Sequence, residues 1–249
     1  MNFDFEKYNN HFDHYIVENF LPEEVAHSIT NEFMDYESDN WFVYKNQIEN
    51  KKALQTWGKF SKETYKLFQY FCSPQFVKVI KDITGINNLY PDYGLHGGGW
   101  HMHGTGGNLN VHKDYSVHPK LGLQRKFNLI VYLCKDWNPE WGGALEFWSH
   151  NEETNKPLRL EKSIDCMYNR AVLFDTTQNS WHGLPTPLTC PKGQYRKSIA
   201  MYYMTDLGCN CVGEKRDRAL FAPREEQKND VVFLASALRY IYAKFHFDL

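Results

Sequence analysis

The sequence has few cysteines, no long apolar run and almost no net charge, and each shortage excludes a class of protein. Six cysteines scattered over 249 residues are too few for a disulfide framework, so we expect reduced thiols in a cytoplasmic protein. No run approaches the roughly 18 apolar residues of a membrane span, and the opening MNFDFEKYNNHFDHY lacks the basic and apolar regions of a signal peptide. Lysine and arginine number 28 against 30 aspartates and glutamates, so the net charge of -2 favours neither a nucleic-acid nor a membrane partner.

Helical patterns are present in the first third of the chain. In NFLPEEVAHSITNEFMDY an apolar residue recurs every four positions and Pro22 stands in the first turn, which predicts a helix packed by one face. These apolar residues are Leu21, Val25, Ile29 and Phe33. In SPQFVKVIKDITG we expect a second helix, with Ser73 as N-cap, Pro74 at the first helical position and Gly85 as the stop.

The pattern changes near residue 88, where glycine, proline and asparagine become frequent and apolar residues alternate or run together. The stretches KFNLIVYLC, GGALEFW, RAVLFD and RKSIAMYYMT predict short strands of a sandwich or barrel. The tail NDVVFLASALRYIYAKF returns to a helical pattern. We therefore expect one domain, with helical support in residues 1–87, a β core in 88–206 and a helical extension in 207–249.

The motif H-x-D occurs three times, at 11–13, 112–114 and 246–248. The first and last copies lie in the terminal segments, and the last ends a predicted helix, where residues two apart point to different sides. His112 and Asp114 follow LNV in extended chain, where a period of two turns both side chains to one face. Only this copy is suited to holding a metal ion.

An iron site with two histidines and one carboxylate needs a second histidine and leaves three coordination positions open. His182, in TTQNSWHGLPTP, follows the predicted strand AVLFD and precedes a Gly/Pro turn, so we expect it at the end of a strand. His101 and His103 in GGGWHMHG also share a face, and they form a rival two-histidine site for zinc or copper.

A second constellation follows in YRKSIAMYY. Arg196 and Ser198 fall on one face of a predicted strand, which Ala200 and Tyr202 continue. A guanidinium and a hydroxyl inside an apolar barrel are costly unless they meet an anion, such as the distal carboxylate of 2-oxoglutarate. Alternation alone also permits the opposite arrangement, with Lys197 pointing inward. Because an inward lysine would have no evident partner, we favour the first arrangement.

Four blocks of the sequence resemble a known family, the Fe(II)/2-oxoglutarate-dependent dioxygenases, in particular the branch that contains the prolyl 4-hydroxylases. The blocks are LNVHKDYS, RKFNLIVYLCKDWNPEWGGALEFW, NRAVLFDTTQNSWHGLPTPLTCP and YRKSIAMYYMTD, within about residues 94–206. The resemblance implies a double-stranded β-helix, also called a jelly roll or cupin-like fold, supported by N-terminal helices and a C-terminal helix.

Carried over by position, the resemblance implies that His112, Asp114 and His182 ligate iron. It implies that Arg196 pairs with the distal carboxylate of 2-oxoglutarate, with Tyr132 on the same carboxylate and Ser198 as a weaker contact. Expected contacts to the primary substrate are Arg125, Tyr202, Asn128 and Tyr115. Aromatic residues that could wall the cleft, or simply pack in the core, are Trp100, Tyr115, Trp148, Trp181 and Tyr202.

The activity that the resemblance implies is hydroxylation of a C–H bond, coupled to decarboxylation of 2-oxoglutarate to succinate. Its cofactors are Fe(II), 2-oxoglutarate and O2, with ascorbate as reductant. The expected substrate is a prolyl residue in a peptide or protein. Two alternatives stay open at this point: the same chemistry on a small metabolite, free amino acid or saccharide, and a non-catalytic metal-binding or sugar-binding β domain.

Overall fold

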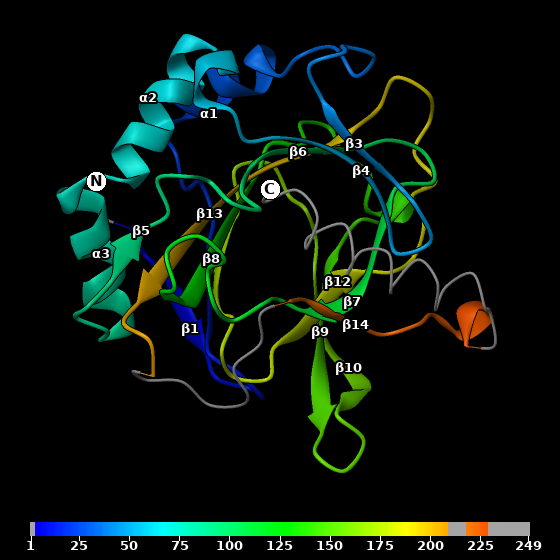
Figure 1. The fold of residues 1–249 in the computed structure, drawn as a ribbon. Helices are drawn as coiled ribbons and strands as arrows, with labels where there is room; N and C mark the ends of the chain where they lie inside the picture. Colours follow the sequence, from blue (N-terminus) through cyan, green and yellow to red (C-terminus); the bar gives the residue numbers. More distant parts are fainter. Residues whose placement is uncertain (1–2, 209–217, 229–249) are drawn as a thin grey trace.

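The computed structural model describes residues 3–208 and 218–228, and its strands form one curled antiparallel sheet (Figure 1). The first seven strands are β1 (Glu6–Tyr8), β2 (His14–Val17), β3 (Phe42–Lys45), β4 (Glu49–Leu54), β5 (Tyr90–Pro91), β6 (Gly99–His103) and β7 (Asn108–Lys113). The other seven are β8 (Gln124–Tyr132), β9 (Leu145–Asn151), β10 (Lys156–Ile164), β11 (Ala171–Asp175), β12 (Trp181–Leu184), β13 (Arg196–Thr205) and β14 (Leu220–Phe221). The predicted mainly β architecture with flanking helices is confirmed.

The sheet joins strands that are far apart in the sequence. Its main path runs β1-β2-β11-β8-β13-β6-β4-β7-β12-β9-β10, while β14 pairs with β7, β3 with β4, and β5 with β13. The four stretches predicted as strands correspond to β8, β9, β11 and β13. Because the sheet curls, the inner faces of β13, β6, β4, β7 and β12 turn toward one another (Figure 1). Residues of these strands line a cavity.

The first 87 residues contain strands as well as helices, so their description as helical support was incomplete. Strand β2 pairs with β11 at the register Val17↔Ala171. Strand β4 bridges two strands of the core, pairing with β6 at Lys52↔Met102 and with β7 at Glu49↔Leu109. The sequence ENKKAL of β4 lacks apolar alternation because its inward positions carry charged side chains, and for this reason the pattern does not indicate a strand.

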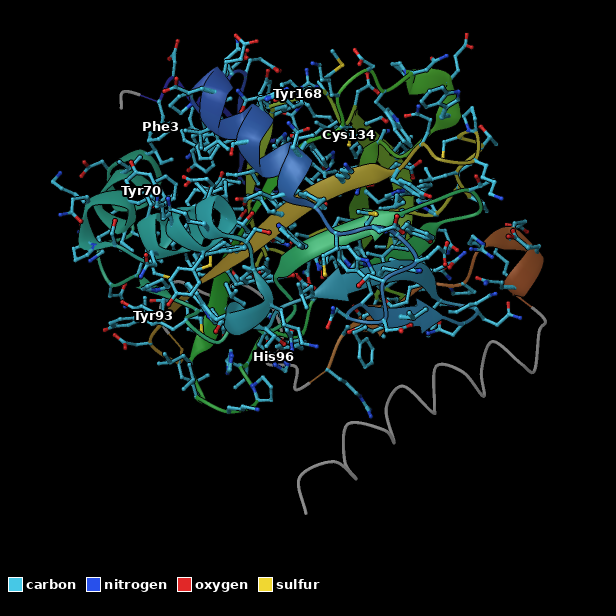
Figure 2. All side chains as sticks on the ribbon, turned by 90° about the horizontal axis from the view of Figure 1, so that it is seen from above. Phe3, Tyr70, Tyr93, His96, Cys134 and Tyr168 are labelled. Carbon is cyan, nitrogen blue, oxygen red and sulfur yellow. The ribbon has the colours of Figure 1, made fainter. Side chains whose placement is uncertain are left out.

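Three α-helices lie on the outer side of the sheet: α1 (Glu23–Glu32), α2 (Lys62–Phe71) and α3 (Pro74–Thr84) (Figures 1 and 2). The predicted ends of α3 are confirmed, since the Ser73 side chain accepts a hydrogen bond from the Phe76 N–H and Gly85 adopts φ 74°. Helix α1 also lies where it was predicted, whereas α2 was not predicted. Three short 3-10 helices connect other elements: Trp57–Lys59, Pro139–Trp141 and Glu225–Gln227.

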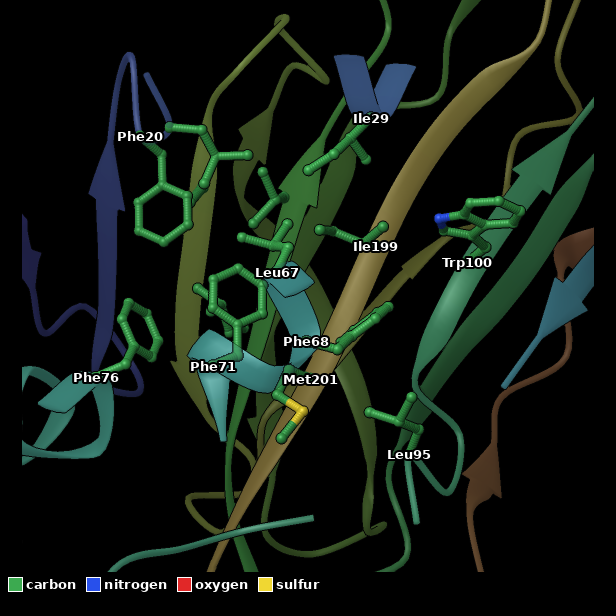
Figure 3. Close-up of a cluster of buried hydrophobic side chains, with 14 of the residues drawn as sticks. Phe20, Ile29, Leu67, Phe68, Phe71, Phe76, Leu95, Trp100, Ile199 and Met201 are labelled. Carbon is green, nitrogen blue, oxygen red and sulfur yellow. The ribbon is translucent and has the colours of Figure 1, made fainter. Parts of the chain in front are cut away.

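The main hydrophobic core lies between these helices and the outer face of β13 (Figure 3). Ile199 and Met201 of β13 are fully buried against apolar side chains of the helices. The helical side chains include Ile29, Leu67, Phe68, Phe71 and Phe76. Burying each such side chain contributes about 1.5–3 kcal/mol. This packing fixes the orientation of β13, because with its odd-numbered residues in the core its even-numbered residues must face the cavity.

The predicted C-terminal helix falls mainly on residues 229–249, outside the described residues. In the part of the chain that the structure describes, no helix is long and apolar enough to cross a membrane.

Candidate metal centre and active-site cavity

His112, Asp114 and His182 meet at the inner surface of the curled sheet. His112 is near the end of β7, Asp114 follows that strand directly, and His182 lies opposite His112 in the β7–β12 register. One potential ligand atom from each of the three side chains lies within 4.8 Å of the others, and all three residues are buried. Among the residues with described positions, this is the only group of three or more histidine, cysteine or acidic side chains so arranged. The sequence prediction had singled out these three residues.

Backbone carbonyls orient both imidazoles. Nδ1 of His112 lies 2.9 Å from the Asn110 carbonyl oxygen, and Nδ1 of His182 lies 2.9 Å from that of Ser180. Because a carbonyl oxygen only accepts hydrogen bonds, each Nδ1 carries the proton and each Nε2 presents its lone pair. The Nε2 atoms of His112 and His182 lie 3.6 and 3.9 Å from the carboxylate oxygens of Asp114. The three side chains thus offer two nitrogen donors and one oxygen donor to a metal ion from one side, a donor set that suits Fe(II).

The electrostatics of this group favour the forms that bind a metal. Burial alone would raise the pKa of Asp114, but His112, His182 and Arg125 beside the carboxylate favour its charged form and shift this pKa downward overall. Burial lowers the pKa of His182 to about 4, and the neighbouring charge of His112 adds to the shift. At neutral pH the site therefore offers a carboxylate and a neutral His182.

One end of the cavity is built around Arg196, the first residue of β13. Arg196 and Ser198 both line the cavity, while Lys197 points outward and donates to the Thr30 carbonyl of α1, so the favoured orientation of the strand is confirmed. Nε of Arg196 donates to the Gly143 carbonyl at 2.7 Å. A Cβ at position 143 would lie 2.9 Å from Cδ of Arg196, and φ at Gly143 is 86°, so only glycine fits here.

Tyr132 packs beneath the same guanidinium, with Cζ of Arg196 5.0 Å from the centre of the tyrosine ring. Its side chain is fully buried, and its hydroxyl has no hydrogen-bond partner within the described residues. Burial raises the pKa of Tyr132, so the hydroxyl keeps its proton and can donate it to an anion. Arg196, Tyr132 and Ser198, which were predicted to act together, are therefore close in space.

The other end of the cavity is built around Arg125, which is 1% exposed. Its guanidinium lies between two tyrosine rings, 3.8 Å from the ring centre of Tyr115 and 3.6 Å from that of Tyr202. Its Nη2 donates to the carbonyl of His96, and no acidic side chain forms a salt bridge with it in the described structure. The Tyr202 hydroxyl donates to Oδ2 of Asp114 at 3.1 Å, which connects this end of the cavity to the metal centre.

The loop that carries His96 is held by a buried acid. Asp92 accepts hydrogen bonds from the Gly94 and His96 N–H groups at 3.0 and 2.9 Å, and Nε2 of His118 lies 3.5 Å from its carboxylate. His96 is labelled at the edge of the molecule in Figure 2, on the side away from α1. His118, which the sequence left without a role, thus links the loop after β7 to the loop that positions Arg125.

The cavity has a volume of about 130 Å³ and draws on more of the chain than the β core that the sequence suggested. The N-terminal segment supplies Tyr44, Glu49 and Lys51, and β14 supplies Phe221, whose ring stacks on His112 at 5.0 Å between centroids. None of these four residues was predicted. A search for a charged pair two positions apart, as in Glu49-x-Lys51, could have suggested β4, but the pattern is common on exposed strands.

The remaining predicted side chains separate into two groups. Asn128, Tyr115 and Tyr202, which were predicted as substrate contacts, line the cavity. Trp100, Trp148 and Trp181 belong instead to hydrophobic clusters, so of the five aromatic residues considered as cleft walls only the two tyrosines serve as such.

His101 and His103 also line the cavity. Within the described residues they have no third side chain that would complete a rival zinc or copper site.

Comparisons with known proteins agree with this geometry. Residues 98–204 match the family model of the 2OG-Fe(II) oxygenase superfamily. No curated protein matches the chain in sequence. A prolyl-4-hydroxylase from Pseudomonas putida has a similar structure, with 14% identity, coverage of 78% of this chain and 93% of that chain, and a TM-score of 0.56.

Two further solved structures are similar. One is a prolyl hydroxylase from Trichoplax adhaerens, in complex with a hypoxia inducible factor oxygen degradation domain peptide fragment (18% identity, 77% and 83% coverage, TM-score 0.53). The other is HygX from Streptomyces hygroscopicus, with nickel, 2-oxoglutarate and hygromycin B bound (12% identity, 84% and 93% coverage, TM-score 0.52). At these identities the similarity shows the fold. The resemblance of the β core to the 2OG-Fe(II) oxygenase superfamily, with a prolyl 4-hydroxylase-like fold, is therefore confirmed.

Proposed function

We propose that this protein is a cytoplasmic Fe(II)- and 2-oxoglutarate-dependent dioxygenase that hydroxylates a prolyl residue in a peptide or protein. The observation that carries the proposal is the group of His112, Asp114 and His182, whose ligand atoms lie within 4.8 Å in a cavity that Arg196 also lines. A metal centre and a buried cation in one cavity suit a cosubstrate that chelates the metal at one end and carries a carboxylate at the other.

The three ligand residues would hold Fe(II), and Arg196, Tyr132 and Ser198 would hold the distal carboxylate of 2-oxoglutarate. When bound, iron and 2-oxoglutarate supply the oxidising chemistry, in which O2 is consumed and 2-oxoglutarate is converted to succinate and carbon dioxide. Ascorbate would keep the iron in the Fe(II) state.

The residues of the chain fix the geometry in which this chemistry can act. Arg125, Tyr115, Tyr202 and Asn128 line the cavity on the substrate side and would hold the prolyl residue against the metal centre. A buried cavity also limits the access of water to the reacting groups.

The test is oxygen-dependent succinate formation with Fe(II), ascorbate and 2-oxoglutarate. We expect succinate from the wild type and background levels from His112→Ala. His11→Ala is the matched control, because His11 belongs to an H-x-D motif at the surface and pairs with Glu161 outside the cavity. If the wild type forms no succinate, anaerobic titration decides: absence of 2-oxoglutarate binding would contradict the proposal and favour a non-catalytic metal-binding β domain.

The same chemistry on a small metabolite, free amino acid or saccharide is the second candidate. Strand β14 favours it, because Phe221 stacks on His112 and takes up space beside the metal centre. Proline-containing peptides, free amino acids and saccharides should be compared for their ability to increase succinate formation. An increase with peptides alone supports the prolyl substrate, and an increase with small molecules alone supports this alternative.

A further inference from the structure

The histidines of β6 line the cavity without a role in the arrangement described above. His103 is 2% exposed, and neither of its ring nitrogens has a hydrogen-bond partner within the described residues. A buried polar group without a partner costs folding free energy, so such a group in a cavity indicates a ligand that will bond to it.

The register of the sheet places His103 beside Arg196. Strand β6 pairs with β13 at Arg196↔His103 and at Ser198↔His101. On its other side β6 pairs with β4 in antiparallel register, at Ala53↔His101 and Lys52↔Met102. Continuing this register by one residue places Lys51 opposite His103. His103 thus stands between two cations on the inner surface of the sheet, next to the guanidinium that would receive the distal carboxylate.

The surroundings keep this imidazole neutral. Burial lowers the pKa of His103 well below its ordinary value, and the charges of Arg196, Lys51 and His101 lower it further. A neutral imidazole has one N–H donor, and with both nitrogens unpaired either one can carry the proton. His103 can therefore present a donor to an anion that lies against Arg196.

The hydrogen-bonding capacity of a carboxylate leaves room for this donor. A carboxylate accepts about four hydrogen bonds. Nε of Arg196 is occupied by the Gly143 carbonyl, so Arg196 would bind a carboxylate through its two terminal nitrogens, with one hydrogen bond from each. The unpaired Tyr132 hydroxyl supplies a third donor. Ser198 and His103 both line the cavity beside Arg196 and are the neighbouring donors for the remaining acceptor position, and both ring nitrogens of His103 are buried there without a partner among the described residues.

We propose that His103 donates a hydrogen bond to the distal carboxylate of 2-oxoglutarate and is thus a further cosubstrate-binding residue. This proposal rests on the proposed function, since it concerns the same cosubstrate. It also gives His103 a role other than zinc binding.

The test is anaerobic calorimetric titration of the Fe(II) protein with two ligands. 2-Oxoglutarate carries the distal carboxylate, whereas 2-oxopentanoate has the same five-carbon chain without it. We expect His103→Phe to weaken 2-oxoglutarate binding by about 10- to 100-fold, the effect of losing one hydrogen bond to a charged group, and to leave 2-oxopentanoate binding unchanged. His103→Gln, which keeps a donor, should recover part of the loss.

Met102→Leu is the matched control, because Met102 lies on the same strand but belongs to the core on the outer face. Thermal unfolding of the metal-free variants separates a binding role from a structural one. We expect His103→Phe to be at least as stable as the wild type, since it removes an unsatisfied buried polar group.

Equal weakening of both ligands by His103→Phe, or unchanged binding of 2-oxoglutarate, would overturn the assignment of His103 while leaving the proposed function intact. A wild type that binds no 2-oxoglutarate would overturn both.

Discussion

The cavity holds a buried arginine at each end, and the two guanidinium groups are held differently. Arg125 lies between the rings of Tyr115 and Tyr202, so both of its faces are covered. Among the described residues, Arg196 has one tyrosine ring against its guanidinium and is anchored through Nε to the Gly143 carbonyl. In the described part of the chain, neither arginine forms a salt bridge with an acidic side chain.

This difference indicates how each arginine can act. Because both faces of its guanidinium are covered, Arg125 can contact a ligand only through the edge of this group, and one edge nitrogen already donates to the His96 carbonyl. Anchoring through Nε directs the terminal nitrogens of Arg196 to a single place, as bidentate binding of a carboxylate requires. Arg196 therefore suits bidentate binding of an anion, whereas Arg125, with both faces covered and one edge nitrogen already used, suits a single polar contact.

The largest expected effect is that of Arg196→Gln. Loss of the charged, bidentate partner should weaken 2-oxoglutarate binding by about 100-fold, measured by anaerobic titration. Lys197→Gln is the control, because this neighbouring cation points away from the cavity toward α1. Similar losses in the two variants would show that net charge, rather than the position of Arg196, determines the affinity.

Arg125→Gln should have a smaller effect that appears in a different measurement. We expect 2-oxoglutarate affinity to stay within about threefold of wild type, while the KM for a primary substrate that stimulates the wild type rises by about tenfold, the effect of one lost polar contact. Lys120→Gln, at an exposed position of the adjacent loop, should leave both quantities unchanged. A loss of 2-oxoglutarate affinity as large as that of Arg196→Gln would remove the distinction between the two ends.

The smallest expected effect concerns the pH dependence of stability at the Arg196 end. Folded His103 has a pKa well below its unfolded value of about 6.5, so below this pH the unfolded chain binds a proton that the folded chain does not. The free energy of unfolding should therefore fall on acidification from pH 6.5, by up to about 1.4 kcal/mol per pH unit from this residue. Urea unfolding of metal-free protein at pH 7, 6 and 5 should show a shallower decline for His103→Phe. Parallel declines would contradict a neutral buried His103.

The sequence predicted the parts of the site that come from regular strands. An H-x-D pair in extended chain must share a face, and this placed His112 and Asp114 together. The orientation of β13 followed from the cost of burying Lys197 without a partner, and the structure shows this lysine outside against α1. Ser73 and Gly85 marked both ends of α3 because caps depend on local backbone geometry.

Other parts could not be predicted because they depend on contacts that leave no pattern in the sequence. The partner of Arg125 at His96 is a backbone carbonyl, which every residue has. Strand β4 carries Glu49 and Lys51 on its inner face. A hydrophobicity pattern cannot distinguish such buried charged residues from those of a solvent-exposed segment. Phe221 reaches the metal centre from a two-residue strand, which is too short for a periodic signal.

The position of β4 between β6 and β7 also constrains how the protein reaches its native state. Strand β4, residues 49–54, can pair with β6 and β7 only when residues 99–113 have come close to it. In the same way, β2 pairs with β11, near residue 171. Pairings over such sequence separations slow folding, because loop-closure entropy is lost before the contacts form. The β7–β12 pairing that places His182 opposite His112 spans a larger sequence separation than the β4–β7 pairing, so the metal centre and the wall that encloses it both depend on slow, long-range pairings.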